Sequence, residues 1–381
     1  MIKDNKSKIF SMSGFSFITK IHDDNFATIT MNGILKIFLG KKPFNCLKQK
    51  QITKTTELYN IKEIIFQKDS LNKPKEKNNN NNTKVINHKI YLLLYAKDIL
   101  IYSFENNYQK SFLIQKIDNK NYIGALIQLD NRNIIFLDKL NKINLMIYIQ
   151  EKKNFFQNEI TQLKINNKIN NTFILSFIEL DKNIVLTTST TKHPLGEDII
   201  RIYKLENNGK NSSLKIIKNF NGFSSAIFEN NVTKLESKKT ICIAINYYIK
   251  NNSILENNCI LLLNYEFLEI TTILQINCCV NSIFNFSLIL EDNNFKRSYD
   301  YIMISQFKGN NNKINKKSAD NCRFIDFYVF EPKYEYEPLL IEEKRIITKS
   351  SIDITNSFII NKNYLVIFQT DQINIYLLKT K

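Results

Sequence analysis

The stretch Asn32-Gly33-Ile34-Leu35-Lys36-Ile37-Phe38 shows the pattern that decides the fold of this chain. A polar turn leads into a short strand rich in Ile and Leu, and the strand ends on an aromatic residue. Further clear copies end on Tyr102, Tyr148, Tyr203 and Tyr376, and weaker copies end on Tyr265 and Tyr328. These aromatic residues lie 46 to 64 residues apart along the chain. Such a spacing is typical of repeated β-sheet units of about 40–50 residues with insertions between them.

A second strand precedes several of these copies, separated from it by a short polar turn. Examples are Lys89–Tyr95, Asn133–Leu137 and Tyr364–Gln369, which are rich in β-branched and aromatic residues. No window shows the spacing of an amphipathic helix. We therefore predict an all-β fold: a seven-bladed β-propeller with four antiparallel strands per blade, forming a single domain over residues 1–381. A strand near Lys8–Phe17 is expected to complete the C-terminal blade.

The repeated pattern resembles the third strand of a WD40 repeat, Asp-Gly-x-Ile-x-Ile-Trp-Asp. Residues 32–38 are the nearest copy, with Asn32 in place of the Asp. The resemblance implies that Asp98, Asp198 and Asp371 are structural turn residues and that Tyr or Phe stands where the family has Trp. The chain departs from the family because it has no Trp, only three His and no Gly-His pair. The buried Asp–His–Ser/Thr–Trp network of typical WD40 repeats is therefore missing, and we interpret the chain as a divergent WD40-like propeller.

Three segments interrupt the repeat. Residues 67–84 form an Asn-rich, low-complexity insert that is predicted to be a disordered loop, and residues 307–321 form a basic, Asn/Lys-rich loop insert. Residues 187–197 lengthen a further loop. Long loops on a rigid scaffold often carry binding functions. An alternative explanation of the first two inserts is the codon bias of an AT-rich genome, which adds polar residues where they do no harm.

The chain is strongly basic, with a formal net charge of +17 and a sequence pI near 9.3. One interpretation is an anionic partner, such as nucleic acid, an anionic membrane or an acidic protein. The other is that codon bias has spread lysines over a solvated surface. The dispersed lysines and the scarcity of Arg, which reads phosphate groups better than Lys does, favour the second interpretation.

Residues that could support catalysis or metal binding are scattered. His22, His88 and His193 lie far apart, and none is paired at the spacing of metal ligands. His22-Asp23-Asp24 suggests a metal site, but a hairpin turn before Asn25 explains these residues better. The chain has no GxSxG, GxGxxG or GxxxxGK[ST] motif. We expect no catalytic, cofactor-binding or metal-binding residues and no cofactor, so the chain is predicted not to be an enzyme.

The six cysteines form no CxxC pair. Cys242 and Cys259 lie inside apolar runs, where small core residues are expected. This usage indicates a reducing compartment rather than a disulfide framework or a zinc site.

The basic segment Phe295-Lys296-Arg297-Ser298 weakly resembles the Phe-Arg-Arg-Gly motif of phosphoinositide-binding propellers, but the Gly and one Arg are missing. Further lysines lie in the loop that follows. The candidate contacts for an anion or a partner are Lys296, Arg297, Lys313, Lys316 and Lys317. A solvated charged loop is the alternative interpretation of these residues.

The leading hypothesis for function is a non-enzymatic scaffold or adaptor that mediates protein–protein interactions in an intracellular complex. A peripheral propeller that binds phosphoinositides or an anionic membrane is the second hypothesis, and an enzyme with a pocket in the propeller channel is the third. Nucleic acid is a less favoured partner. The N-terminus has no apolar core typical of a signal peptide, and no stretch approaches 18 uninterrupted apolar residues. We therefore expect a cytoplasmic or nuclear protein without a transmembrane segment, whose protein partners the sequence does not identify.

Overall fold

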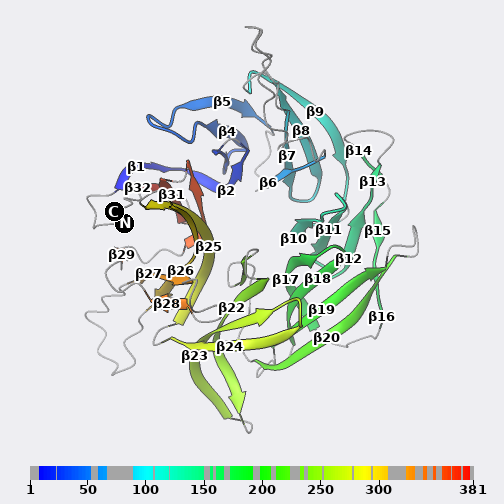
Figure 1. Ribbon diagram of the computed structural model, residues 1–381. Coiled ribbons are helices and arrows are strands. Elements are labelled where there is room, and N and C mark those ends of the chain that lie inside the picture. The colour runs from blue at the N-terminus through cyan, green and yellow to red at the C-terminus, as the bar shows by residue number, and fades with distance from the viewer. Residues whose placement is uncertain are drawn as a thin grey trace, which may run out of the picture. The chain divides into compact units, whose positions relative to one another are not determined.

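The computed structural model describes residues 8–22, 24–52, 59–66, 89–105, 108–119, 121–149, 155–157, 160–166, 172–191, 198–206, 212–223, 232–235, 239–250, 253–276, 279–292, 295–307, 323–330, 338–340, 346–348, 354–361, 363–369 and 372–377. Every regular element among them is a β-strand (Figure 1), which confirms the all-β prediction. The insert at 67–84 lies outside the described residues, and only Phe307 of the insert at 307–321 is described.

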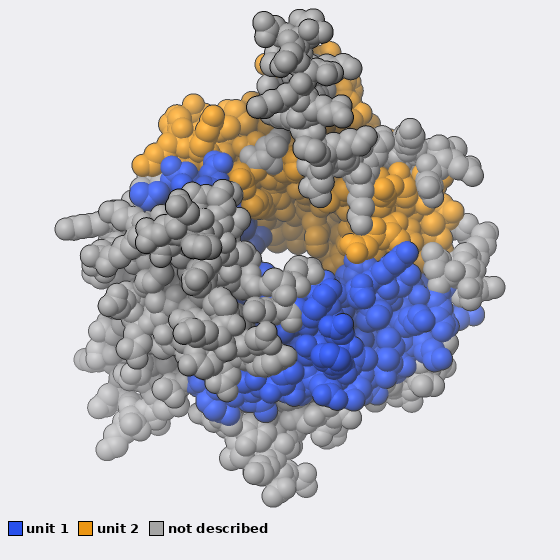
Figure 2. Space-filling model, viewed as in Figure 1, with its two compact units in different colours: residues 1–14, 163–381 blue, residues 15–162 orange. Residues whose placement is uncertain are grey.

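The chain divides into two compact units (Figure 2), and each is treated separately below. Unit 1 comprises residues 1–14 and 163–381, and unit 2 comprises residues 15–162. The expectation of a single propeller domain remains a prediction.

Unit 2 contains three four-stranded antiparallel sheets and one short strand pair. The first sheet has the order β2 (Phe15–Ile21), β3 (Asn25–Thr30), β4 (Ile34–Phe38) and β5 (Cys46–Gln51). The second has the order β6 (Asn60–Ile64), β7 (Ile90–Tyr95), β8 (Ile99–Glu105) and β9 (Lys110–Ile117). The third has the order β10 (Ile123–Gln128), β11 (Ile134–Asp138), β12 (Ile143–Met146) and β15 (Thr161–Gln162), and β13 (Tyr148–Ile149) pairs with β14 (Phe155–Phe156).

Unit 1 contains the strands that come from both ends of the chain. One sheet has the order β1 (Lys8–Ser13), β32 (Gln372–Leu377), β31 (Tyr364–Gln369) and β30 (Ile354–Ile360). Another has the order β25 (Cys279–Asp292), β26 (Phe295–Phe307), β27 (Arg323–Phe330) and β28 (Pro338–Leu340), with β29 (Ile346–Thr348) also paired to β27. The pairing of β1 with β32 confirms that an N-terminal strand completes the C-terminal sheet, although this strand ends at Ser13 and not at Phe17.

The predicted number of seven blades is wrong, because the described residues form six sheets of four or more strands. The two repeats that end on Tyr203 and Tyr265 belong to one nine-stranded sheet of unit 1. This sheet has the order β17 (Thr172–Asp181), β18 (Ile184–Thr191), β19 (Asp198–Glu206), β20 (Ser213–Phe223), β22 (Thr240–Lys250), β23 (Ser253–Asn264) and β24 (Glu269–Gln275), with β16 (Lys164–Asn166) on β20 and β21 (Val232–Leu235) on β22. A single residue pair, Phe223 with Tyr248, joins β20 to β22.

The near-continuous apolar strands are buried on both faces, as β7 illustrates. Successive side chains of a strand point to opposite faces of its sheet. Ile90, Leu92 and Leu94 pack in one core cluster with the first sheet of unit 2. Tyr91, Leu93 and Tyr95 pack in a second cluster with the third sheet. Burial of each such side chain contributes about 1.5–3 kcal/mol, so the packing between sheets is the main source of stability.

Asn and Asp occupy four of the nine described non-glycine positions with positive φ in this glycine-poor chain. Among the described turn residues with positive φ are Asp24, Asn141, Asn183 and Asn361. Asn and Asp tolerate this left-handed backbone conformation better than other residues with a side chain. At these four turns, Asn or Asp takes a backbone conformation that glycine often takes in other chains. The other five described non-glycine positions with positive φ are Phe44, Tyr108, Arg132, Lys239 and Leu268.

Neighbouring sheets are linked by side-chain carboxamides that bind the backbone of the next sheet. In unit 2, Gln115 forms two hydrogen bonds with the backbone of Phe156, and Gln128 forms two with the backbone of Ile65. In unit 1, Asn285 accepts a hydrogen bond from Thr233 and donates one to the carbonyl of Lys234. These bonds satisfy polar groups at the junctions of sheets, where no Trp or Gly-His pair is available.

Candidate functional site: a platform of three turns

Two of the five residues predicted to contact an anion or a partner lie in a described strand. The backbone of Lys296 and Arg297 lies in β26, opposite Glu291 and Leu290 of β25. Lys313, Lys316 and Lys317 lie outside the described residues, so the contact of all five residues with an anion or partner stays a prediction.

The predicted turn aspartates have different positions. Asp98 lies in the turn between β7 and β8, where its backbone oxygen accepts a hydrogen bond from Ala96 and its carboxylate contacts Lys116 at 3.3 Å. Asp198 is the first residue of β19, and Asp371 lies outside the described residues. A structural role for all three aspartates stays a prediction.

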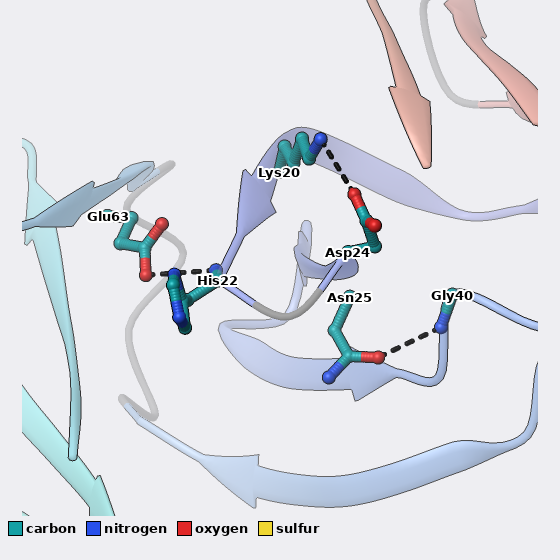
Figure 3. A network of polar contacts seen from close by, with 6 residues as sticks. All are labelled: Lys20, His22, Asp24, Asn25, Gly40 and Glu63. Atoms are coloured by element: carbon teal, nitrogen blue, oxygen red, sulfur yellow. Dashed lines mark hydrogen bonds and ion pairs between the residues drawn. The ribbon is translucent and has the colours of Figure 1, made fainter. Parts of the chain in front are cut away.

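The segment around His22 forms a hairpin turn between β2 and β3 (Figure 3), in agreement with the turn interpretation. Lys20 and Asp24 form an ion pair of 2.9 Å, and the backbone N–H of His22 donates to Glu63 Oε1 at 3.0 Å. Asn25 accepts a hydrogen bond from the backbone N–H of Gly40. The polar groups of this hairpin turn therefore bind one another and neighbouring residues. The described residues contain no group of three or more His, Cys, Asp or Glu that could hold a metal ion.

Three segments of unit 2 are joined by backbone hydrogen bonds, and we call them together the turn platform. They are the β7–β8 turn, the linker from β9 to β10, of which Lys120 is not described, and the β11–β12 turn. Ile123 N–H donates to the carbonyl of Ala96 at 2.8 Å, and Lys139 N–H donates to the carbonyl of Tyr122 at 2.9 Å. Because the linker is hydrogen-bonded to both turns, the three segments lie edge to edge.

Asp138 holds the β11–β12 turn of this platform. Its Oδ1 accepts hydrogen bonds from the backbone N–H groups of Leu140 at 2.9 Å and Lys142 at 3.0 Å. Its Oδ2 accepts a bond from Asn121 of the linker at 3.1 Å. Sequence analysis missed this residue, although an Asp at the start of a short polar turn with Asn141 was the available signal.

Two large apolar side chains are exposed on the turn platform. Tyr122 is 40% exposed and Leu140 is 60% exposed. The Nζ of Lys139 lies 4.4 Å from the centroid of the Tyr122 ring, a cation–π distance. Lys97 and Lys142 are also exposed. The platform therefore presents apolar side chains beside lysines on a backbone that is held by hydrogen bonds.

The carboxylates of the platform are already engaged. Lys116 lies 2.9 Å from Asp118 and 3.3 Å from Asp98. The hydrogen bonds to Asp118 and then to Asp98 raise the pKa of Lys116. No described carboxylate forms an ion pair with Lys97, Lys139 or Lys142, so the free charge on this surface is positive.

Several solved structures have a similar fold. A chain in the crystal structure of the Mitotic Checkpoint Complex has a TM-score of 0.57 and 8% identity over 99% of this chain and 96% of that chain. The β-propeller domain of Cps50 (Swd1) from Myceliophteria thermophila has a TM-score of 0.53 and 10% identity over 98% of both chains. The fold is a β-propeller. The WD40 domain of SCAP from fission yeast covers 94% of this chain and 82% of its own, with 11% identity and a TM-score of 0.47.

No protein-family model and no curated protein sequence matches this chain. The β-propeller assignment therefore rests on the strand arrangement and on structural similarity. Four of the six larger sheets are four-stranded antiparallel blades, as predicted, and the number of blades is six in place of the predicted seven. The described residues contain no helix that is long and apolar enough to cross a membrane.

Proposed function

We propose that this chain is a non-enzymatic scaffold that binds a protein partner in an intracellular complex through the turn platform. The observation that carries the proposal is the pair of exposed side chains, Tyr122 and Leu140, on turns held together by backbone hydrogen bonds. Interfaces are enriched in aromatic anchors, and a rigid backbone lowers the entropy cost of binding.

The platform resembles a protein-binding surface more than a catalytic one. Its three carboxylates, Asp98, Asp118 and Asp138, already bind Lys116, backbone N–H groups or the Asn121 amide. General acid–base catalysis needs carboxylates that face the reacting group. One similar structure is part of the Mitotic Checkpoint Complex, and membership of a complex is the role proposed here.

An affinity capture from the native cell, read by quantitative mass spectrometry, tests the proposal. The full chain is compared with a Tyr122→Ser/Leu140→Ser variant. The matched control is Phe267→Ser/Ile273→Ser, which removes two side chains of 68% and 55% exposure from unit 1. Loss of an anchor residue typically weakens binding by about 1–2 kcal/mol or more. We expect the captured amount of at least one protein to fall by about 10-fold or more with the platform variant and to stay unchanged with the control.

Two outcomes contradict the proposal. One is a set of captured proteins that does not differ between the wild type and the platform variant. The other is an equal loss of captured protein with the Phe267/Ile273 control, because this result would show that the partner binds any exposed apolar side chains and not the turn platform in particular.

A further inference from the structure

The strands β5 and β9 are the last strands of the first two sheets of unit 2 (Figure 1). The segments around them have an unusual charge pattern. Residues 39–52 and 108–117 contain six lysines and no Asp or Glu. The lysines are Lys41, Lys42, Lys48, Lys50, Lys110 and Lys116. We call these two segments the β5–β9 surface.

Contacts between the two strands place these charges side by side. Lys48 Nζ donates to the carbonyl of Gln109 at 2.7 Å, and Lys50 Nζ donates to Ser111 Oγ at 3.1 Å. Lys50 Nζ also lies 4.7 Å from the centroid of the Tyr102 ring. The lysines of β5 thus reach across to β9 and bind neutral groups of the neighbouring sheet.

Most of this positive charge has no carboxylate partner among the described residues. Lys116 pairs with Asp98 and Asp118, and Lys110 lies opposite Glu105, which pairs with Lys89. The described ion pairs include none of the four lysines in residues 39–52. Burial, and then the charge of Lys48, lower the pKa of Lys50.

Large apolar side chains are exposed among the lysines. Leu47 is 39% exposed, Phe112 is 51% exposed and Leu113 is 48% exposed. Phe112 and Leu113 are consecutive residues of a strand, so they point to opposite faces of the sheet. Both remain half exposed because β9 is the last strand of its sheet.

Protection of a sheet edge against aggregation is the simplest alternative explanation. Lysines on an outer strand prevent edge-to-edge pairing with another chain. This explanation accounts for Lys48 and Lys50. It does not account for Phe112 and Leu113 on the adjacent outer strand, because exposed apolar residues favour association.

We propose that the β5–β9 surface binds the surface of an anionic lipid bilayer. Lysines on these strands are attracted to the negative headgroups. Because Phe112 and Leu113 point to opposite faces of the sheet, the outer edge of β9, together with Leu47, is the part that enters the interface between headgroups and acyl chains. The surface lacks Arg, which is the preferred residue for reading nucleic-acid phosphates, and its apolar residues would gain nothing from a solvated polyanion. This surface adjoins the turn platform at Lys116, which pairs with Asp98 and Asp118. The side chains that are proposed to enter the bilayer differ from Tyr122 and Leu140, which are proposed to bind the protein partner.

Flotation of the full chain with vesicles tests this proposal. Phosphatidylcholine vesicles are compared with vesicles that contain about 30% phosphatidylserine, at about 0.1 M salt. The charge variant is Lys41→Gln/Lys42→Gln, since both residues are exposed loop residues. Its matched control is Lys139→Gln/Lys142→Gln on the turn platform. The apolar variant is Phe112→Ser/Leu113→Ser.

We expect binding to the anionic vesicles only. Each lysine near such a surface contributes about 1 kcal/mol, so the charge variant should bind about 10-fold to 30-fold more weakly while its control changes less than about 3-fold. The apolar variant should also lose at least about 10-fold in binding. Circular dichroism shows whether each variant retains the β-sheet spectrum of the wild type.

Several results would overturn the proposal. These are no flotation with anionic vesicles, equal binding to neutral vesicles, or an equal loss with the Lys139/Lys142 control. Full binding by the apolar variant, or displacement from vesicles by a poly-glutamate peptide at equal charge concentration, would assign the surface to a soluble acidic partner instead. Because none of these variants changes Tyr122 or Leu140, failure here leaves the protein-binding proposal to its own test.

Discussion

The carboxamide of Gln115 on β9 forms two hydrogen bonds with the backbone of Phe156 on β14. Gln115 Nε2 donates to the Phe156 carbonyl at 2.9 Å, and the Phe156 N–H donates to Gln115 Oε1 at 3.0 Å. Both residues are buried, with 8% exposure for Gln115 and 1% for Phe156. A side chain thus completes the pairing that a neighbouring strand would otherwise provide, and it links two sheets of unit 2.

Replacement of Gln115 by Leu is expected to lower the free energy of unfolding by about 2–4 kcal/mol. The substitution leaves the buried N–H and carbonyl of Phe156 without their partner, and each unsatisfied group costs about 1–3 kcal/mol. Urea unfolding measures the change. Gln49→Leu, on an exposed position of β5, is the control and should change the stability by less than about 0.5 kcal/mol. Equal effects of the two substitutions would contradict this role of Gln115.

Gly40 is expected to be intolerant of any side chain. A Cβ at this position would lie 1.7 Å from the backbone oxygen of Asp24, whereas a Cβ at Gly124 would meet only the oxygen of Leu137 at 3.8 Å. Gly40→Ala should therefore destabilise the protein by about 2–4 kcal/mol. Gly124→Ala should be neutral or stabilise it by up to about 1 kcal/mol. Thermal unfolding of the two variants in parallel measures the difference, and a well-tolerated Gly40→Ala would show that the β2–β3 turn is packed differently.

Two neighbouring threonines of β18 should respond in opposite ways to loss of the hydroxyl. Thr187 and Thr188 are both fully buried. Thr188 shares a hydrogen bond of 2.6 Å with Ser176, whereas Thr187 Oγ1 has no hydrogen-bond partner in the described part of the chain. Thr188→Val should cost about 1–2 kcal/mol, and Thr187→Val should be neutral or stabilise by up to about 1 kcal/mol. The urea midpoints of the two isosteric variants test this prediction. A larger loss of stability with Thr187→Val than with Thr188→Val would contradict it.

Buried thiols predict a loss of stability in alkaline solution. Burial raises the pKa of Cys259 from 9.0 to about 11, and burial also raises the pKa of Cys242. The neutral thiol of Cys259 therefore contributes stability that is fully present below pH 9.0 and is lost as the pH rises toward about 11. In this range, Cys259→Ala should make the fall in unfolding free energy shallower by up to about 1.4 kcal/mol per pH unit.

The matched control for the thiol prediction is Cys46→Ala, because Cys46 is exposed. Its alkaline slope should equal that of the wild type. A Cys259→Ala slope that equals the wild-type slope would show that this thiol is not buried in the folded chain.

Local patterns in the sequence were sufficient to predict the repeated strands. The alternation of Ile, Leu and aromatic residues predicted β31 as Tyr364–Gln369, the same bounds that the structure shows. The number of blades was not predictable in this way. It depends on the pair Phe223 and Tyr248, where the long strands β20 and β22 meet, and no local signal shows where a long strand finds a distant partner.

The turn platform could not be predicted from the sequence either. Tyr122 and Leu140 resemble core residues in the sequence, and only the arrangement of the turns shows that they are exposed. The basic loops were favoured as candidate sites because the sequence gives the charge of each residue but not the surface on which it lies. The lysines of β5 were overlooked because this strand has only two, and they alternate with Gln.

Hydrogen–deuterium exchange of the chain with its captured protein partner tests the central claim most directly. The account predicts slower exchange in peptides that cover residues 96–98, 118–123 and 139–142, and unchanged exchange in β24. Protection that is confined to other parts of the chain, or no protection of these three segments, would contradict a scaffold that binds its partner through the turn platform.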